Sequence, residues 1–120
     1  MRFGDKIYFC KKLKGVEVFD APQEITLQPN HFSLQPTKAL TDILAYGKDV
    51  DKFYIAYAPI DEWGAKYFKQ YDRFYLDYVE PTDDEEYGEK ANAEIVSVSY
   101  QNLFIKLVIR KIVANQEEEY

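Results

Sequence analysis

The sequence of 120 residues is poor in the residue types that form cross-links and metal sites, with one cysteine and one histidine. Cys10 alone cannot form an internal disulfide, which is typical of a chain made in a reducing compartment. His31 alone cannot supply a histidine cluster for a metal ion, and its place in a proline-rich stretch favours a surface or packing role over catalysis. Folding must therefore rely on a hydrophobic core, for which a single domain of this length is large enough.

Motifs that carry chemistry are also missing. Cys10 follows Phe9 in an apolar run, so we expect a buried thiol rather than a nucleophile. The acidic residues 83–86 lack the ligand spacing of a calcium loop, which favours a solvated charge run. The sequence has no glycine-rich phosphate loop, no nucleophile elbow and no pair of cysteines spaced for redox chemistry. We predict that the protein is not an enzyme and uses neither a cofactor nor a metal.

Long apolar runs are absent too. No run approaches the length of a membrane span, and the start Met-Arg-Phe-Gly-Asp-Lys lacks the apolar centre of a secretion signal. We therefore expect a soluble protein that is made inside the cell and has no membrane partner.

Aromatic residues, in contrast, are abundant. They make up 17% of the chain, with 11 tyrosines and 8 phenylalanines. A tyrosine packs its ring while its hydroxyl stays in water, so this density suits half-buried strands and also protein interfaces. The composition thus favours a β protein that buries surface against partners.

The net charge of -6 is unevenly distributed. Residues 80–89 carry six acids and residues 117–119 carry three, which is nine of the 21 acids. The rest of the chain has 12 acids against 15 bases, an excess of about three positive charges. This balance disfavours tight sequence-specific binding of nucleic acid.

Residues 93–113 give the strongest structural signal. Leu103, Ile105, Leu107 and Ile109 recur at a spacing of two, which predicts a strand with one buried face. The polar pair Gln101-Asn102 separates this run from a second β-rich run. We therefore predict a long terminal hairpin, which needs other strands to cover it.

Other segments supply those strands. Residues 6–19 read as a first hairpin that turns at Lys14-Gly15, residues 52–58 as an interior strand stopped by Pro59, and residues 73–79 as a further strand. Residues 23–27 and 32–34 are candidates for short strands, but prolines at 22, 29 and 36 keep residues 21–36 out of the sheet centre, so we expect an extended arm or long loop there.

Two segments carry helical signals. Residues 37–47 have a cap-like threonine and a terminal glycine, and residues 61–71 repeat Trp63, Tyr67 and Tyr71 at a spacing of four. Residues 80–90 are expected to form a mobile acidic loop and residues 114–120 a disordered acidic tail. The predicted fold is mainly β: residues 1–113 form one small antiparallel barrel or sandwich of five to six strands, with a long inserted loop and one or two short helices.

The chain resembles a known protein family in the order of three segments that are followed by the terminal hairpin. These segments are Met-Arg-Phe-Gly-Asp-Lys-Ile-Tyr-Phe at residues 1–9, Tyr-Gly-Lys-Asp-Val-Asp-Lys-Phe-Tyr-Ile-Ala-Tyr at 46–57, and Tyr-Asp-Arg-Phe-Tyr-Leu-Asp at 71–77. With the Ile-rich hairpin that follows, the chain resembles the head-closure and head-to-tail connector proteins of tailed bacteriophages, a family of putative minor capsid proteins. The acidic residues 80–89 depart from that pattern.

The resemblance implies a structural protein of the virion, assembled in the bacterial host cytoplasm. Such proteins form a ring under the portal, close the DNA channel and provide the surface to which the tail attaches. The implied partners are portal or adaptor proteins, tail proteins, further copies of the chain and, without sequence specificity, the packaged DNA. Residues 28–50 then form a channel-facing loop, with Gln28, Lys38, Asp42, Lys48 and Asp49 as candidate residues.

Five aromatic residues are the candidates for the subunit or partner interface, because aromatic side chains are enriched at such interfaces. They are Tyr54, Tyr57, Trp63, Tyr67 and Phe68. The alternative function is a stand-alone β-barrel that binds nucleic acid or carbohydrate on exposed tyrosines. It predicts that Tyr54, Tyr57 or Tyr75 is exposed in one groove.

Overall fold

The computed structural model describes residues 2–13, 18–36, 53–82 and 86–112. Within them, seven strands form one antiparallel sheet in the order β2-β1-β5-β6-β7-β4-β3, and one short helix, α2 (Ile60–Trp63), follows β4. The predicted mainly β class is confirmed, although seven strands replace the expected five to six and the sheet is not closed into a barrel. The strands are β1 (Lys6–Cys10), β2 (Gln23–Thr26), β3 (Ser33–Pro36), β4 (Phe53–Pro59), β5 (Arg73–Tyr75), β6 (Ala93–Gln101) and β7 (Phe104–Lys111).

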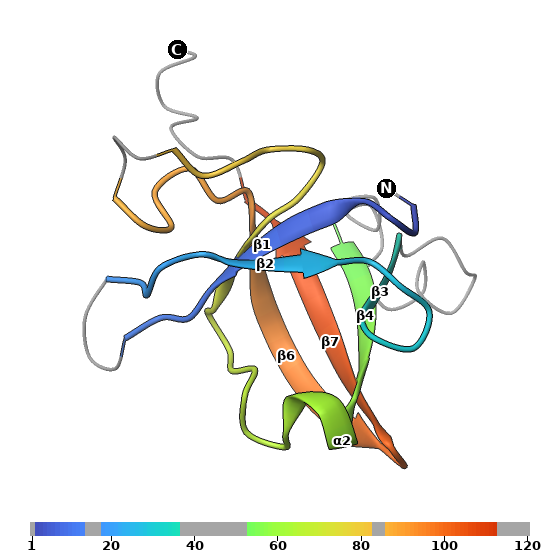
Figure 1. The fold of residues 1–120 in the computed structure, drawn as a ribbon. Coiled ribbons are helices and arrows are strands. Elements are labelled where there is room, and N and C mark those ends of the chain that lie inside the picture. The colour runs from blue at the N-terminus through green and yellow to red at the C-terminus, as the bar shows by residue number, and fades with distance from the viewer. Residues whose placement is uncertain (1, 14–17, 37–52, 83–85, 113–120) are drawn as a thin grey trace.

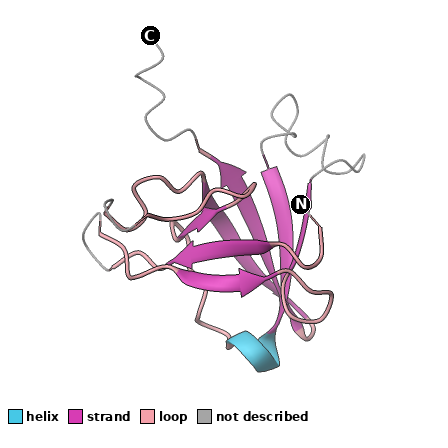
Figure 2. Ribbon diagram, turned by 45° about the horizontal axis from the view of Figure 1, so that its top comes forward, coloured by secondary structure: helices cyan, strands magenta, loops and turns pink. Residues whose placement is uncertain are grey.

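The two edge strands of the sheet, β2 and β3, follow one another in the chain. The turn between them is held by an isolated bridge from Gln28 to Phe32. Figure 1 shows β1 and β2 running across β6, β7 and β4, and Figure 2 shows the same crossing after a turn of 45°. The sheet therefore curls around one apolar core, to which β1, β2, β4, β5, β6 and β7 all contribute buried side chains.

The predicted terminal hairpin is confirmed. β6 and β7 pair from Ala93 opposite Lys111 to Gln101 opposite Phe104. The loop begins at Asn102, whose φ of 56° belongs to the left-handed region that turns of the primed type require and that asparagine tolerates. Leu103 was predicted to share the buried face of β7, but it is 68% exposed because it is the second loop residue.

A register shift interrupts β6 between Ile95 and Ser97. Without it, Ile95 and Val98 would lie on opposite faces of the strand. The extra residue, Val96, brings Val98 opposite Leu107 and Tyr100 opposite Ile105, so apolar residues on both sides of the shift face the core side.

The proline-rich residues 21–36 are not the loop that the sequence predicts. They form β2 and β3, and they contribute three side chains to the core: Ile25, Leu27 and Phe32. The physical basis of the prediction nevertheless holds, since both strands lie at the sheet edges, where proline is tolerated. Part of the first hairpin is present, because Lys12 bridges to Phe19 and the N–H groups of Leu13 and Asp20 bond to the oxygens of Val18 and Lys11, whereas β1 itself pairs with β2. The predicted turn at Lys14-Gly15 lies outside the described residues.

The predicted helix over residues 61–71 is wrong beyond its first turn. Helix α2 ends at Gly64, which has φ 89°, and the following residues form turns. β5 is likewise shorter than predicted, because Asp77 and Tyr78 have positive φ and leave the strand. The interior strand is confirmed as β4, whereas the predicted helix at 37–47 and the tail at 114–120 lie outside the described residues. No helix in the described ranges is long and apolar enough to cross a membrane.

Candidate functional site

The candidate channel-facing loop is only partly described. Gln28 is exposed in the turn between β2 and β3, where its backbone pairs with Phe32. Lys38, Asp42, Lys48 and Asp49 lie outside the described residues. Residues 37–52 connect β3 to β4, and these strands are neighbours in the sheet with Pro36 opposite Tyr54. Residues 37–52 therefore begin and end at neighbouring strands of the sheet.

The five candidate interface aromatics do not form one surface. Tyr54 lies opposite the buried Ile109 and packs against the core, and its hydroxyl donates to Asp77 Oδ1 at 3.4 Å. Tyr57 is three residues further along the same strand, so its side chain points to the opposite face. Both rings are half-buried. They cannot belong to a single interface patch on one face of β4.

The other three candidates, Trp63, Tyr67 and Phe68, are neighbours in one aromatic cluster. Phe68 is 3% exposed, and its ring centroid lies 5.1 Å from that of Phe9 and 5.8 Å from that of Phe32. Trp63 and Tyr67 are half-buried against the same cluster. Phe68 therefore belongs to the core and has almost no surface to offer to a partner, while Trp63 and Tyr67 cover one side of that core.

His31 is held by this aromatic cluster. Its Nδ1 lies 2.7 Å from Glu62 Oε2, its ring centroid lies 5.0 Å from that of Trp63, and its backbone oxygen accepts from Trp63 Nε1 at 2.7 Å. Together with Gln23 and Tyr67, these residues line an open pocket of about 320 Å³. The contacts of His31 are those of a packing residue, in agreement with the sequence-based interpretation.

Asp72 is the one buried acidic residue in the described ranges, at 2% exposed. One carboxylate oxygen accepts from the backbone N–H of Lys12 at 2.8 Å and the other accepts from that of Lys69 at 3.0 Å. Lys11 Nζ lies 3.6 Å from the carboxylate and also donates to the backbone oxygen of Tyr67. Asp72 thus ties the segment between α2 and β5 to the end of β1.

A second polar cluster surrounds Arg73. The guanidinium carbon lies 4.8 Å from the centroid of the Phe19 ring, and Nη1 donates to the backbone oxygen of Gly88 at 3.0 Å. Arg73 also lines a pocket of about 250 Å³, whose other lining residues are Lys12, Phe19, Tyr71 and Glu94. The Nε of Arg73 is buried and has no hydrogen-bond partner within the described chain. Since that atom is inaccessible, it gives a ligand nothing to bind.

Hydrogen bonds and burial shift several pKa values. The backbone N–H of Arg2 and the hydroxyl of Tyr78 both donate to Asp5 and lower its pKa, and the same carboxylate raises the pKa of Tyr78. Burial raises the pKa of Tyr67, and burial together with Glu80 raises the pKa of Tyr8. None of these groups is a histidine or cysteine, so none of these shifts prepares a nucleophile or base near neutral pH.

The tip of the terminal hairpin was missed by the sequence analysis. Tyr100, Leu103 and Phe104 are 52%, 68% and 41% exposed, and the backbone oxygen of Leu103 accepts from the N–H of Ile60 at 2.8 Å. Tyr100 lies on the core side of the hairpin and Phe104 on the opposite side, with the loop residue Leu103 between them, so apolar side chains are exposed around the whole tip. The alternation along β7 does identify its buried face, but it does not reveal that the strand begins at Phe104.

Within residues 2–13, 18–36, 53–82 and 86–112, no group of three histidine, cysteine, aspartate or glutamate side chains converges as a metal site would require. Cys10 is buried, as the sequence predicts. Comparison with protein family models, with curated proteins and with solved structures finds no match to this chain.

Proposed function

We propose that the protein is a structural component of a tailed-bacteriophage virion, where a ring of its copies closes the DNA channel under the portal and receives the tail. The proposal rests on the resemblance of the sequence to head-to-tail connector proteins. The observation that carries it furthest in the structure is the exposed apolar hairpin tip. Monomers rarely leave several large apolar side chains clustered at one end, and such clusters are typical of protein interfaces.

The arrangement of the strands supports a ring. The sheet ends in two edge strands, β2 and β3, whose outer backbone groups have no strand partner within the described chain. Copies related by rotation use two different surfaces in each contact, and a molecule with an apolar tip and two separate edges offers different surfaces. We further propose that each subunit is a small barrel that is open between β2 and β3.

Loss of the gene tests the proposed role. We expect particles that lack the protein to package DNA, then lose it or fail to acquire tails, and we expect added protein to restore tail attachment. Electron microscopy of the particles, with quantification of retained DNA, measures both effects. Fully infectious particles without the protein would rule the proposal out.

The hairpin tip gives a sharper test. The double variant Leu103→Asp/Phe104→Asp places two charges on the apolar tip, and since both side chains are exposed, we expect the fold to survive. Restoration of tail attachment should fall at least tenfold, because burying an unpaired carboxylate in an interface costs more than about 1.4 kcal/mol. Val18→Asp, at an exposed apolar residue outside the tip, is the matched control.

The alternative binding module receives no support from the tyrosines. Tyr75 is fully buried, and Tyr54 and Tyr57 point to opposite faces of β4, so no groove contains them together. Salt-dependent binding of single-stranded DNA to the purified protein would reopen that alternative.

A further inference from the structure

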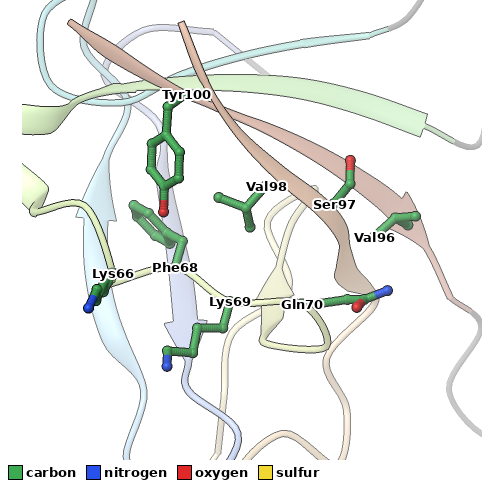
Figure 3. Close-up of a pocket in the computed structure, with 8 residues that line it drawn as sticks. All are labelled: Lys66, Phe68, Lys69, Gln70, Val96, Ser97, Val98 and Tyr100. Atoms are coloured by element: carbon green, nitrogen blue, oxygen red, sulfur yellow. The ribbon is translucent and has the colours of Figure 1, made fainter.

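An open groove lies beside the second half of β6. It has a volume of about 550 Å³, within the range of ligand sites in proteins. Figure 3 shows Tyr100 and Val98 on one side and Phe68 below them, with the segment that bears Lys66 and Lys69 opposite. The lining residues are Lys66, Phe68, Lys69, Gln70, Val96, Ser97, Val98 and Tyr100.

The groove exists because β6 loses its neighbour on one side. β5 pairs with β6 only at Ala93 and Glu94. Ile95 still bonds to the preceding segment, through its N–H to Asp72 and its oxygen to the N–H of Tyr71, both at 2.9 Å. Beyond Ile95 that segment bends away, and it returns to β6 only where the Tyr100 hydroxyl donates to the backbone oxygen of Ala65. Between these two ties, β6 has an open edge.

The backbone groups of Val98 and Tyr100 point toward this groove. In a hairpin with a two-residue loop, the closing pair Gln101 and Phe104 exchanges hydrogen bonds, and bonded pairs alternate with non-bonded pairs along the ladder. Val98 opposite Leu107 and Tyr100 opposite Ile105 are therefore non-bonded pairs, so their N–H and C=O groups face away from β7. No backbone hydrogen bond within the described chain uses those groups on the groove side.

The side chains around the open edge define what would fit it. Val98 and the ring of Tyr100 offer apolar surface, because the bulge at Val96 turns both side chains to the core side. Lys66 and Lys69 are exposed on the opposite wall, and no ion pair within the described residues involves either of them. The groove therefore combines strand-pairing backbone groups, apolar surface and two positive charges.

We infer that this groove binds an extended acidic peptide segment of a partner protein, which adds to β6 as a strand. The backbone of the segment bonds to the backbone groups of Val98 and Tyr100, its alternate apolar side chains contact the side chains of the same two residues, and its carboxylates face Lys66 and Lys69. The open edge from Val96 to Tyr100 accommodates about 17 Å of extended chain, or about five residues. The inference does not depend on the proposed phage role, since the purified full chain tests it.

The probe is the acetylated and amidated peptide Thr-Glu-Val-Glu-Val-Glu-Thr, titrated into the 15N-labelled full chain. We expect saturable shifts of the amide signals of Val98 and Tyr100. The affinity should fall at least threefold when salt shortens the Debye length from about 10 Å to about 3 Å. Shifts confined to other parts of the sheet would overturn the inference, as would displacement of the peptide by an equally long single-stranded oligonucleotide that binds the same amides.

Two methylated peptides test strand addition itself. One carries N-methyl groups on both valines and the other on the first two glutamates, so each removes the N–H groups of only one edge of the extended peptide. Since only one edge can face β6, we expect one isomer to lose at least tenfold in affinity and the other to bind within about threefold of the parent, given about 1 kcal/mol for each lost hydrogen bond. Equal behaviour of the two isomers, whether both bind or both fail, would overturn the inference.

Charge variants test the choice of an acidic partner. Lys66→Glu/Lys69→Glu should weaken peptide binding about tenfold, whereas Lys6→Glu on β1 changes the same charge outside the groove and should change the affinity less than twofold. An unchanged affinity for the double variant would contradict the inference.

In the full chain, neutralisation of Glu117, Glu118 and Glu119 to glutamine should leave peptide binding unchanged. A tenfold gain in affinity would mean that the chain's own acidic segment is the occupant, and the partner would be excluded.

Discussion

Gly88 is the residue whose identity the structure constrains most narrowly. It has φ 83°, and a Cβ atom built on it would lie 2.6 Å from Cδ2 and 2.8 Å from Cγ of the Phe19 ring. The guanidinium carbon of Arg73 lies 4.8 Å from the centroid of the same ring, and Arg73 Nη1 bonds to the oxygen of Gly88. Displacement of the Phe19 ring would break its contact with Arg73. Phe19, Arg73 and Gly88 therefore form one packed unit.

Gly88→Ala should therefore destabilise the protein by about 2–4 kcal/mol, which is the sum of backbone strain at positive φ and overpacking against a ring. Gly64→Ala is the matched control, because Gly64 has φ 89° but nothing within 4 Å of its added Cβ. That variant should lose only the strain, about 1–2 kcal/mol. Urea unfolding of both variants measures the difference. Equal losses would show that the Phe19 ring moves aside easily.

At the scale of elements, the carboxylate of Asp72 ties the segment between α2 and β5 to the end of β1. Asp72 accepts from the backbone of Lys12 after β1 and of Lys69 within the segment, and it is buried beside Lys11. Residues 64–72 contain no strand and only turns, so few other backbone bonds hold them against the core.

Asp72→Asn should cost about 2–4 kcal/mol, because an amide nitrogen would replace one of the two accepting oxygens and the charge facing Lys11 would vanish. The exposed Asp20→Asn, which involves the same change of side chain, should cost less than about 0.5 kcal/mol. Thermal unfolding compares the two. In Asp72→Asn, hydrogen exchange should also accelerate at the amide of Lys69, and unchanged protection there would contradict the assigned role.

The individual strands show how much of the fold can be predicted from the sequence. The terminal hairpin was predictable because alternation continues through β7, and β4 was predictable because its run is apolar on both faces and stops at Pro59. β2 and β3 were only candidates for strands, since runs of four residues between prolines carry no resolvable period. The aromatic spacing at Trp63 and Tyr67 imitates a helix, yet both rings reach the core from turns after Gly64.

The groove beside β6 could not be predicted from the sequence, for a physical reason. It requires the bulge at Val96, the early end of β5 and the bend of residues 64–72, and each of these is a tertiary outcome. The sequence did indicate the aromatic richness of the surroundings. It did not separate Phe68, which is buried in the core, from Tyr100, which is exposed at the tip.

For the whole molecule, raised pKa values of tyrosines contribute to the response of stability to alkaline pH, together with the raised pKa of Lys111. The pKa values of Tyr8, Tyr67 and Tyr78 are raised above their ordinary value of 10.0, with burial as the main cause for Tyr8 and Tyr67 and the bond to Asp5 for Tyr78. A group with a raised pKa in the folded state keeps its proton there longer than in the unfolded chain. Above pH 10 the unfolded state therefore binds fewer protons, and the free energy of unfolding falls as pH rises.

We expect the ionisation of these tyrosines to leave the free energy of unfolding unchanged below pH 9. From pH 10 upward, the free energy of unfolding should decline as pH passes through the folded-state pKa values of these tyrosines. Guanidinium titrations at half-unit steps measure the slope. Tyr8→Phe/Tyr67→Phe removes two of the three groups and should make the decline shallower than in the native protein. A decline that persists unchanged in the double variant would mean that other groups, such as lysines that lose their charge, control alkaline unfolding.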